Sequence, residues 1–150
     1  MTTHVLTGLL LLVLPVAYNL LYTLLARAFD YPDILRQPTR QVLERFAAGG
    51  SRLVLLWWGF AMSAVLLAPA VVLLSATLAD ADPTVLALAT AAGLLAALVQ
   101  FLGLVRWPFA VPHLARVATD PAASPATIDA VEDPVARRLA VAFDELALAI

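Results

Sequence analysis

The side chains that could do chemistry in this sequence are few and mostly uncharged. Asn19 and Gln100 each place an amide within a long apolar stretch, and Tyr22 follows Asn19 by about one helical turn. Counted back from the same end of their stretches, the amides lie at depths of about 12 and 9 Å, so they can meet. Amides and phenols bind neutral ligands or join helices by hydrogen bonds. Both interpretations stay open for Asn19, Tyr22 and Gln100: contacts between helices, or the wall of a small-molecule pocket.

The histidines and acidic residues form no catalytic or metal-binding set. His4 and His113 are the two histidines, and we expect a membrane about 30 Å thick between them. The chain has no cysteine, which excludes thiolate metal sites and cysteine nucleophiles. The acids ahead of Pro134 fit a helix N-terminus better than acid-base catalysis, and no GxSxG, HExxH, P-loop or dinucleotide motif occurs. We expect no catalytic residue, metal or cofactor, and no nucleic acid as a partner.

The elements that must position these side chains are membrane helices. The chain has 150 residues, 63% of them hydrophobic, and a mean hydropathy of +0.92. Residues 5–26, 53–78 and 85–105 contain no charged residue, and each exceeds the roughly 20 residues needed to cross a bilayer. The predicted fold class is an all-α integral membrane bundle of three transmembrane helices with two short amphipathic cytoplasmic helices. We divide it into a transmembrane region, 1–117, and a cytoplasmic Pro/Asp-rich linker and helix, 118–150.

Arginines set the expected orientation. The nine basic residues are all arginine, and five of them fall in the loop between the first two spans. Cytoplasmic loops collect such residues, so we expect this loop and the C-terminus in the cytoplasm and the N-terminus outside. Guanidinium groups near a membrane attract anionic lipid. The candidate lipid contacts are Arg27, Arg40, Arg52 and Arg106.

Two cytoplasmic segments have helical apolar patterns. In 38–48 the apolar side chains fall on one side, with Gly49 and Gly50 as a stop signal. This helix would either lie flat on the leaflet or pack under the bundle. A similar pattern covers 134–150.

Local signals predict how the spans join and associate. Asp82 and Pro83 indicate the N-cap and first residue of the third helix, and the short link before it makes the second and third helices antiparallel neighbours. Pro108 indicates a break after the third span. Small residues spaced by four let helices approach closely in lipid. We expect contact with other subunits or self-association through Ala89, Gly93 and Ala97.

Several stretches resemble a known family. They are YPDILR at 31–36, FAAGGSRL at 46–53, WWG at 57–59, RWPF at 106–109 and the stretch 120–127. They are similar to an uncharacterised family of bacterial, mainly actinobacterial, multi-span membrane proteins classed as a domain of unknown function. The resemblance covers about residues 1–131, and the Gly-Glu-His motif of the family's later spans is absent here. It implies a bacterial inner-membrane protein and supplies no catalytic residues.

The sequence therefore favours a non-enzymatic membrane protein that serves as an accessory or assembly subunit of a larger complex. The alternative is an oligomeric carrier of a small molecule or lipid, with Asn19, Tyr22 and Gln100 lining a pocket open to the cytoplasm. An enzyme comes third, because no acid-base pair or activated nucleophile is present.

Overall fold

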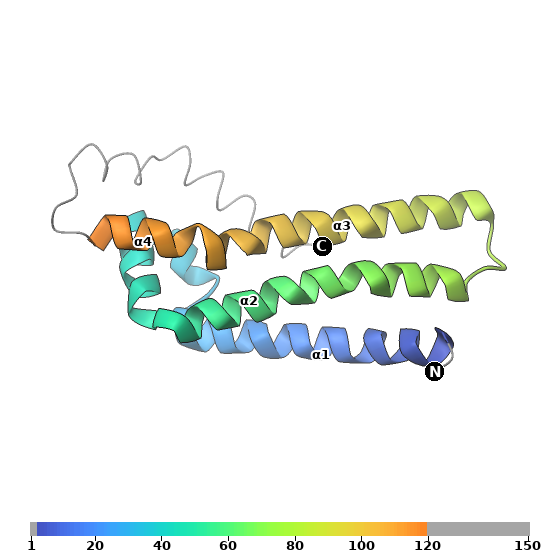
Figure 1. Cartoon of the computed structure of the whole chain (residues 1–150), viewed down its shortest axis with the longest axis horizontal. Coiled ribbons are helices and arrows are strands. Elements are labelled where there is room, and N and C mark those ends of the chain that lie inside the picture. The colour runs from blue at the N-terminus through green and yellow to red at the C-terminus, as the bar shows by residue number, and fades with distance from the viewer. Residues whose placement is uncertain (1–2, 120–150) are drawn as a thin grey trace.

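The computed structural model describes residues 3–119, and within that range the regular elements are all helices. They are α1 (Thr3–Phe29), the short 3-10 helix η1 (Asp33–Arg36), α2 (Thr39–Thr77), α3 (Pro83–Phe109) and α4 (Val111–Thr119). The long helices α1, α2 and α3 run side by side with alternating direction (Figure 1). The predicted linker and helix of 118–150 fall almost wholly outside the described residues, as does the acidic group before Pro134.

Three helical segments are long and apolar enough to cross a membrane: Thr3–Phe29, Thr39–Thr77 and Pro83–Val117. Each covers one of the three uncharged stretches of the sequence, the second except for Leu78, so the helices agree with the expected three spans in number, length and composition. Residues 3–119 are all-helical outside their turns, as in a membrane protein with three spanning helices. The helices extend beyond the predicted spans because their polar ends continue the helical hydrogen bonding past the apolar part.

The central helix is α2, which packs against α1 on one side and α3 on the other. Glycines allow α2 to lie close to α1 and close to α3. A Cβ atom added at Gly59 would lie 3.2 Å from Cδ2 of Leu21 on α1, and one added at Gly93 would lie 2.8 Å from Cγ1 of Val71 on α2. The backbones are therefore closer than a larger side chain would permit.

This packing changes the interpretation of the small-residue face on α3. Gly93 contacts α2 of the same chain, and Ala97 is buried, whereas Ala89 is exposed. Gly93 and Ala97 thus serve packing within the chain, while Gly93 is only half-buried and Ala89 is exposed. Association with other subunits through this face stays a prediction.

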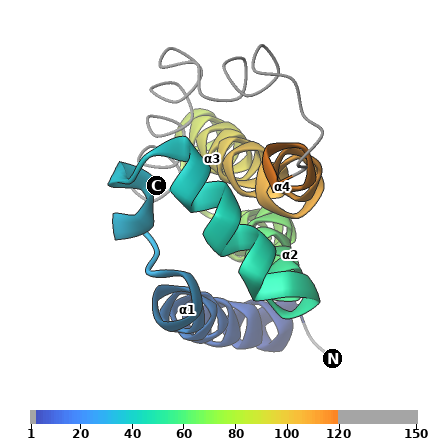
Figure 2. The same cartoon turned by 90° about the vertical axis from the view of Figure 1, so that its left-hand side faces the viewer.

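A sharp bend at Gly50 divides α2. The backbone there has φ 56° and ψ −153°, a combination that only glycine adopts readily. Gly49 and Gly50 therefore mark a bend, after which the helix resumes. The preceding part lies across the end of the bundle (Figure 2), and its Leu43 and Phe46 are buried in the core. Of the two placements left open for this segment, the structure has it packed on the bundle.

The junctions around α3 agree with both local signals. The Asp82 carboxylate accepts hydrogen bonds from the backbone N–H groups of Thr84 and Val85 at 2.9 and 3.0 Å, as an N-cap should. Pro108 was expected to mark the end of the span, and α3 ends one residue later, at Phe109. Proline removes only its own backbone donor, and Ala110 keeps a helical conformation and donates to the Arg106 carbonyl at 2.8 Å. Ala110 alone therefore separates α3 from α4.

The core lies at the end of the bundle where α1 finishes, α2 begins and α3 finishes. There the indoles of Trp57 and Trp107 stack with ring centres 4.4 Å apart and planes 8° apart. Phe29 meets both edge-on. The described arginines come from the elements that meet here, while the opposite end holds the α2–α3 link with Asp80 and Asp82 (Figure 1). The molecule has one aromatic, arginine-rich end and one aliphatic end.

Candidate functional site

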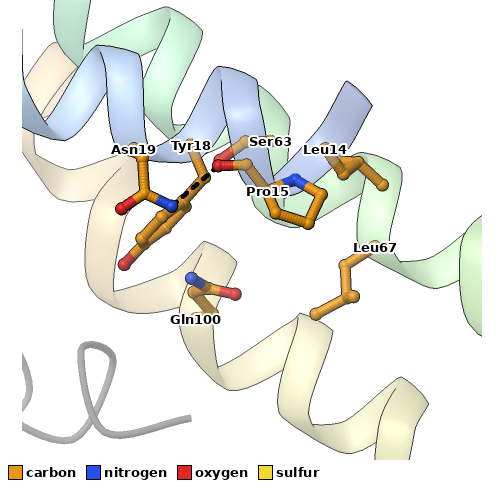
Figure 3. A pocket seen from close by; sticks show the side chains of 7 residues that line it. All are labelled: Leu14, Pro15, Tyr18, Asn19, Ser63, Leu67 and Gln100. Atoms are coloured by element: carbon orange, nitrogen blue, oxygen red, sulfur yellow. Dashed lines mark hydrogen bonds between the residues drawn. The ribbon is translucent and has the colours of Figure 1, made fainter. Parts of the chain in front are cut away.

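A pocket of about 370 Å³ lies at the junction of the three long helices (Figure 3). Its lining is formed by α1 with Leu14, Pro15, Tyr18 and Asn19, by α2 with Ser63 and Leu67, and by α3 with Gln100. The volume is at the lower end of the range for small-molecule sites. α1 and α3 each pack chiefly on α2 and little on each other. The pocket occupies the space between α1 and α3 at this level.

The polar groups of the pocket are only partly occupied within the chain. The Asn19 amide donates to the Pro15 carbonyl at 2.8 Å, and the Ser63 hydroxyl donates to the Phe60 carbonyl at 2.6 Å. Gln100 and Tyr18 also line this space, from α3 and α1. An amide has two donor hydrogens and two acceptor lone pairs, and a hydroxyl oxygen that donates can still accept. Hydrogen-bonding capacity therefore remains on all three helices.

Burial differs between the inner wall and the mouth. Ser63 and Gln100 are each only 7% exposed, so the α2 and α3 sides form the floor. Tyr18 is half-buried and Asn19 is exposed, which places Asn19 at the rim. The pocket combines an apolar wall with a few polar groups pointing inward (Figure 3), the usual composition of a site for a small ligand.

The structure brings together two of the three predicted pocket residues. Asn19 and Gln100 line the same space, as their depths allow, but Tyr22 does not. Tyr22 instead packs edge-on to Tyr31 with ring centres 6.0 Å apart, and lies 6.4 Å from the Phe60 ring. Tyr18 contacts Phe60 at 4.7 Å. These rings form a layer between the pocket and the arginine-rich end.

Tyr18 and Ser63 line the pocket but were not among the residues predicted to do so. A signal for Tyr18 was present, because it lies one turn after Leu14 and directly before Asn19 on α1. Ser63 could have been placed by depth, since α1 and α2 are antiparallel and a polar residue within each span can fall at a similar level.

The four arginines proposed as lipid contacts have different surroundings. Arg27 and Arg52 are exposed and form no salt bridge within residues 3–119. Arg40 pairs with Glu44 at 3.0 Å. The half-buried Arg106 lies 5.7 Å above the Trp107 ring, a cation–π contact. Arg27 and Arg52 are the two most available to an anionic headgroup.

Metal-ligating side chains do not gather in the part of the chain that the structure describes. No group of three or more His, Cys, Asp or Glu residues there could hold an ion. His4 lies near the start of α1 and His113 on α4, at opposite ends of the bundle (Figure 1).

Comparison with known proteins gives a family for this chain. A family model described as a domain of unknown function, DUF4386, matches residues 6–146. The chain belongs to this family. The match confirms the predicted membership of a family of unknown function and extends beyond residue 131, where the resemblance was expected to end. Searches of the curated proteins and of the solved structures gave no match.

Proposed function

We propose that the protein is a non-enzymatic subunit of a larger complex in a bacterial inner membrane, with an accessory or assembly role. The observation that supports this most is the outer face of α1. Leu12, Val16 and Leu20 on this helix are 71%, 67% and 59% exposed, and the polar residues Asn19 and Thr23 are exposed among them.

Polar side chains on a lipid-facing surface are unusual, because membrane helices generally turn them toward other helices. The Thr23 hydroxyl donates to the Asn19 carbonyl at 2.7 Å, and Asn19 gives one of its two amide hydrogens to the Pro15 carbonyl. Their oxygens remain able to accept from a partner. A neighbouring subunit whose helix carries a hydroxyl or amide donor would cover this face and pair those oxygens.

The proposed orientation follows from the arginine-rich end. Placing it in the cytoplasm agrees with the distribution of basic residues in membrane proteins, and leaves the N-terminus and the α2–α3 link outside. Arg27 and Arg52 would then meet the anionic headgroups of the inner leaflet. These contacts would fix the depth of the subunit in the membrane.

The complex can be tested by native mass measurement after mild detergent extraction from the native membrane. We expect the wild-type chain in an assembly of defined mass larger than one chain. The double variant Asn19→Leu, Thr23→Val should release single chains, because it removes both acceptors from the outer face of α1. Thr84→Val, which removes an exposed hydroxyl at the other end of the bundle, should not. A wild-type chain that extracts only as a monomer would refute the proposal.

The second candidate, an oligomeric carrier of a small molecule or lipid, is favoured by the meeting of Asn19 and Gln100 in one pocket. A carrier open to the cytoplasm would require the aromatic layer of Tyr18, Tyr22 and Phe60 to move aside. The double variant Asn19→Leu, Gln100→Leu separates the two functions. In a carrier it should abolish ligand binding. In a subunit there is no ligand binding to lose, and the variant should change stability and weaken assembly through the lost Asn19 acceptor.

A further inference from the structure

We propose that the pocket between α1, α2 and α3 binds the head of a neutral membrane lipid that carries both a carbonyl and a hydroxyl group, such as a diacylglycerol. The lipid would enter sideways from the bilayer, with its acyl chains remaining outside. The pocket is formed within one chain, but its rim residue Asn19 also lies on the α1 face proposed for a neighbouring subunit, so the lipid head and the subunit would compete for the Asn19 oxygen.

The position of the pocket favours entry from lipid. Its α1 residues lie between Leu14 and Asn19, so Arg27 is eight residues beyond the rim, a rise of about 12 Å along the helix. On the side toward the arginine-rich end, the Phe60 ring contacts the rings of Tyr18 and Tyr22. The exposed rim residue Asn19 is on the side of the bundle, where apolar side chains of α1 surround it. The mouth therefore faces hydrocarbon.

The electrostatics of the lining favour an uncharged ligand. None of its residues carries a charge at neutral pH, so an ionic head would lose its water without gaining a counter-charge. A phosphate headgroup is disfavoured at this depth for the same reason. Leu14, Pro15 and Leu67 provide an apolar wall for the first carbons of a chain.

The hydrogen-bonding groups of the lining match a lipid head that carries both a carbonyl and a hydroxyl group. Gln100 and Tyr18 supply donors for a carbonyl, and the oxygens of Asn19 and Ser63 can accept from a hydroxyl. The Ser63 hydrogen and one of the two Asn19 amide hydrogens are already given to backbone carbonyls. A volume of about 370 Å³ holds a glycerol ester head but not two acyl chains. Buried polar groups are costly in a membrane unless they are hydrogen-bonded. Binding of such a head would therefore supply partners for the donors and acceptors of the lining that have none within the chain.

Photolabelling in lipid nanodiscs tests the proposal with the full chain. The probe is a diacylglycerol with a diazirine in the acyl chain next to the ester, and labelled residues are mapped by peptide mass spectrometry. We expect saturable labelling around residues 14–19 and 63–67 that unlabelled diacylglycerol competes away. Leu14→Trp, which fills the pocket, should reduce it roughly tenfold, equivalent to about 1.4 kcal/mol. Leu12→Trp places the same ring on the exposed face of the same helix and should leave labelling unchanged.

A second probe distinguishes binding of the head from general contact with lipid. A hydrocarbon of matched length with the same diazirine but no head should label the exposed helix surfaces evenly, and Gln100→Leu should reduce labelling by the diacylglycerol probe alone. Equal labelling of the pocket by both probes, or failure of competition in the wild-type chain, would overturn the proposal. The competition experiment needs no variant, so the result stands even if a substitution prevents folding.

Discussion

At the scale of single residues, the meeting of Asn19 and Gln100 shows how far depth in a membrane can be predicted. Helix rise and the alternating direction of neighbouring spans place two side chains at one level. They do not give the rotation of a helix about its axis. In α1 and α3 nearly every residue is apolar, so no hydrophobic face reveals that rotation. Tyr22 was therefore placed in the pocket instead of Tyr18, although the two differ by one turn.

Gly93 provides a test of close packing between residues. Gly93→Ala should lower the free energy of unfolding by about 1–3 kcal/mol, because the new Cβ would lie 2.8 Å from Cγ1 of Val71. Unfolding in mixed detergent micelles, followed by circular dichroism, measures this. Gly8→Ala is the matched control, since nothing lies within 4 Å of a Cβ there.

A double-mutant cycle links that effect to Val71. With Val71→Ala also present, the cost of Gly93→Ala should largely disappear, because the methyl groups it meets are gone. If Gly93→Ala costs the same with and without Val71, the close contact between α2 and α3 is not what the substitution disturbs.

At the scale of elements, local signals were reliable where the structure depends on neighbouring residues alone. Asp82 and Pro83 begin α3 as predicted because an N-cap requires only its own first turn. Pro108 marks the end of α3 to within one residue, because a proline near a helix end removes a backbone donor there. The placement of the segment before Gly50 could not be chosen from sequence, since it depends on distant residues of the core.

The bend at Gly50 should be sensitive to any side chain. We expect Gly50→Ala to destabilise the fold by about 1–3 kcal/mol, the usual cost of forcing a residue with a Cβ into this backbone region. Ser51→Ala, at the exposed and helical neighbouring position, should have little effect. Thermal unfolding in detergent compares the two. Equal stability of both variants would mean that the helix can pass this point without the bend.

At the scale of the whole molecule, the distribution of arginines predicts which end faces the cytoplasm. The natural chain has no cysteine, so single cysteines can be introduced without background. In intact cells a membrane-impermeant maleimide should label Ala79→Cys, on the α2–α3 link, but should reach Gln41→Cys only after permeabilisation. Both positions are exposed in the fold, so burial cannot explain a difference. Labelling of Gln41→Cys alone in intact cells would reverse the orientation.

The parallel stack of Trp57 and Trp107 is an intrinsic spectroscopic probe of the protein. Two indoles with ring centres 4.4 Å apart share their electronic excitation, so their ultraviolet absorption and emission differ from those of an isolated chromophore. One indole belongs to α2 and the other to α3. Loss of the coupled spectrum would therefore report the separation of these two helices in real time, with no dye attached.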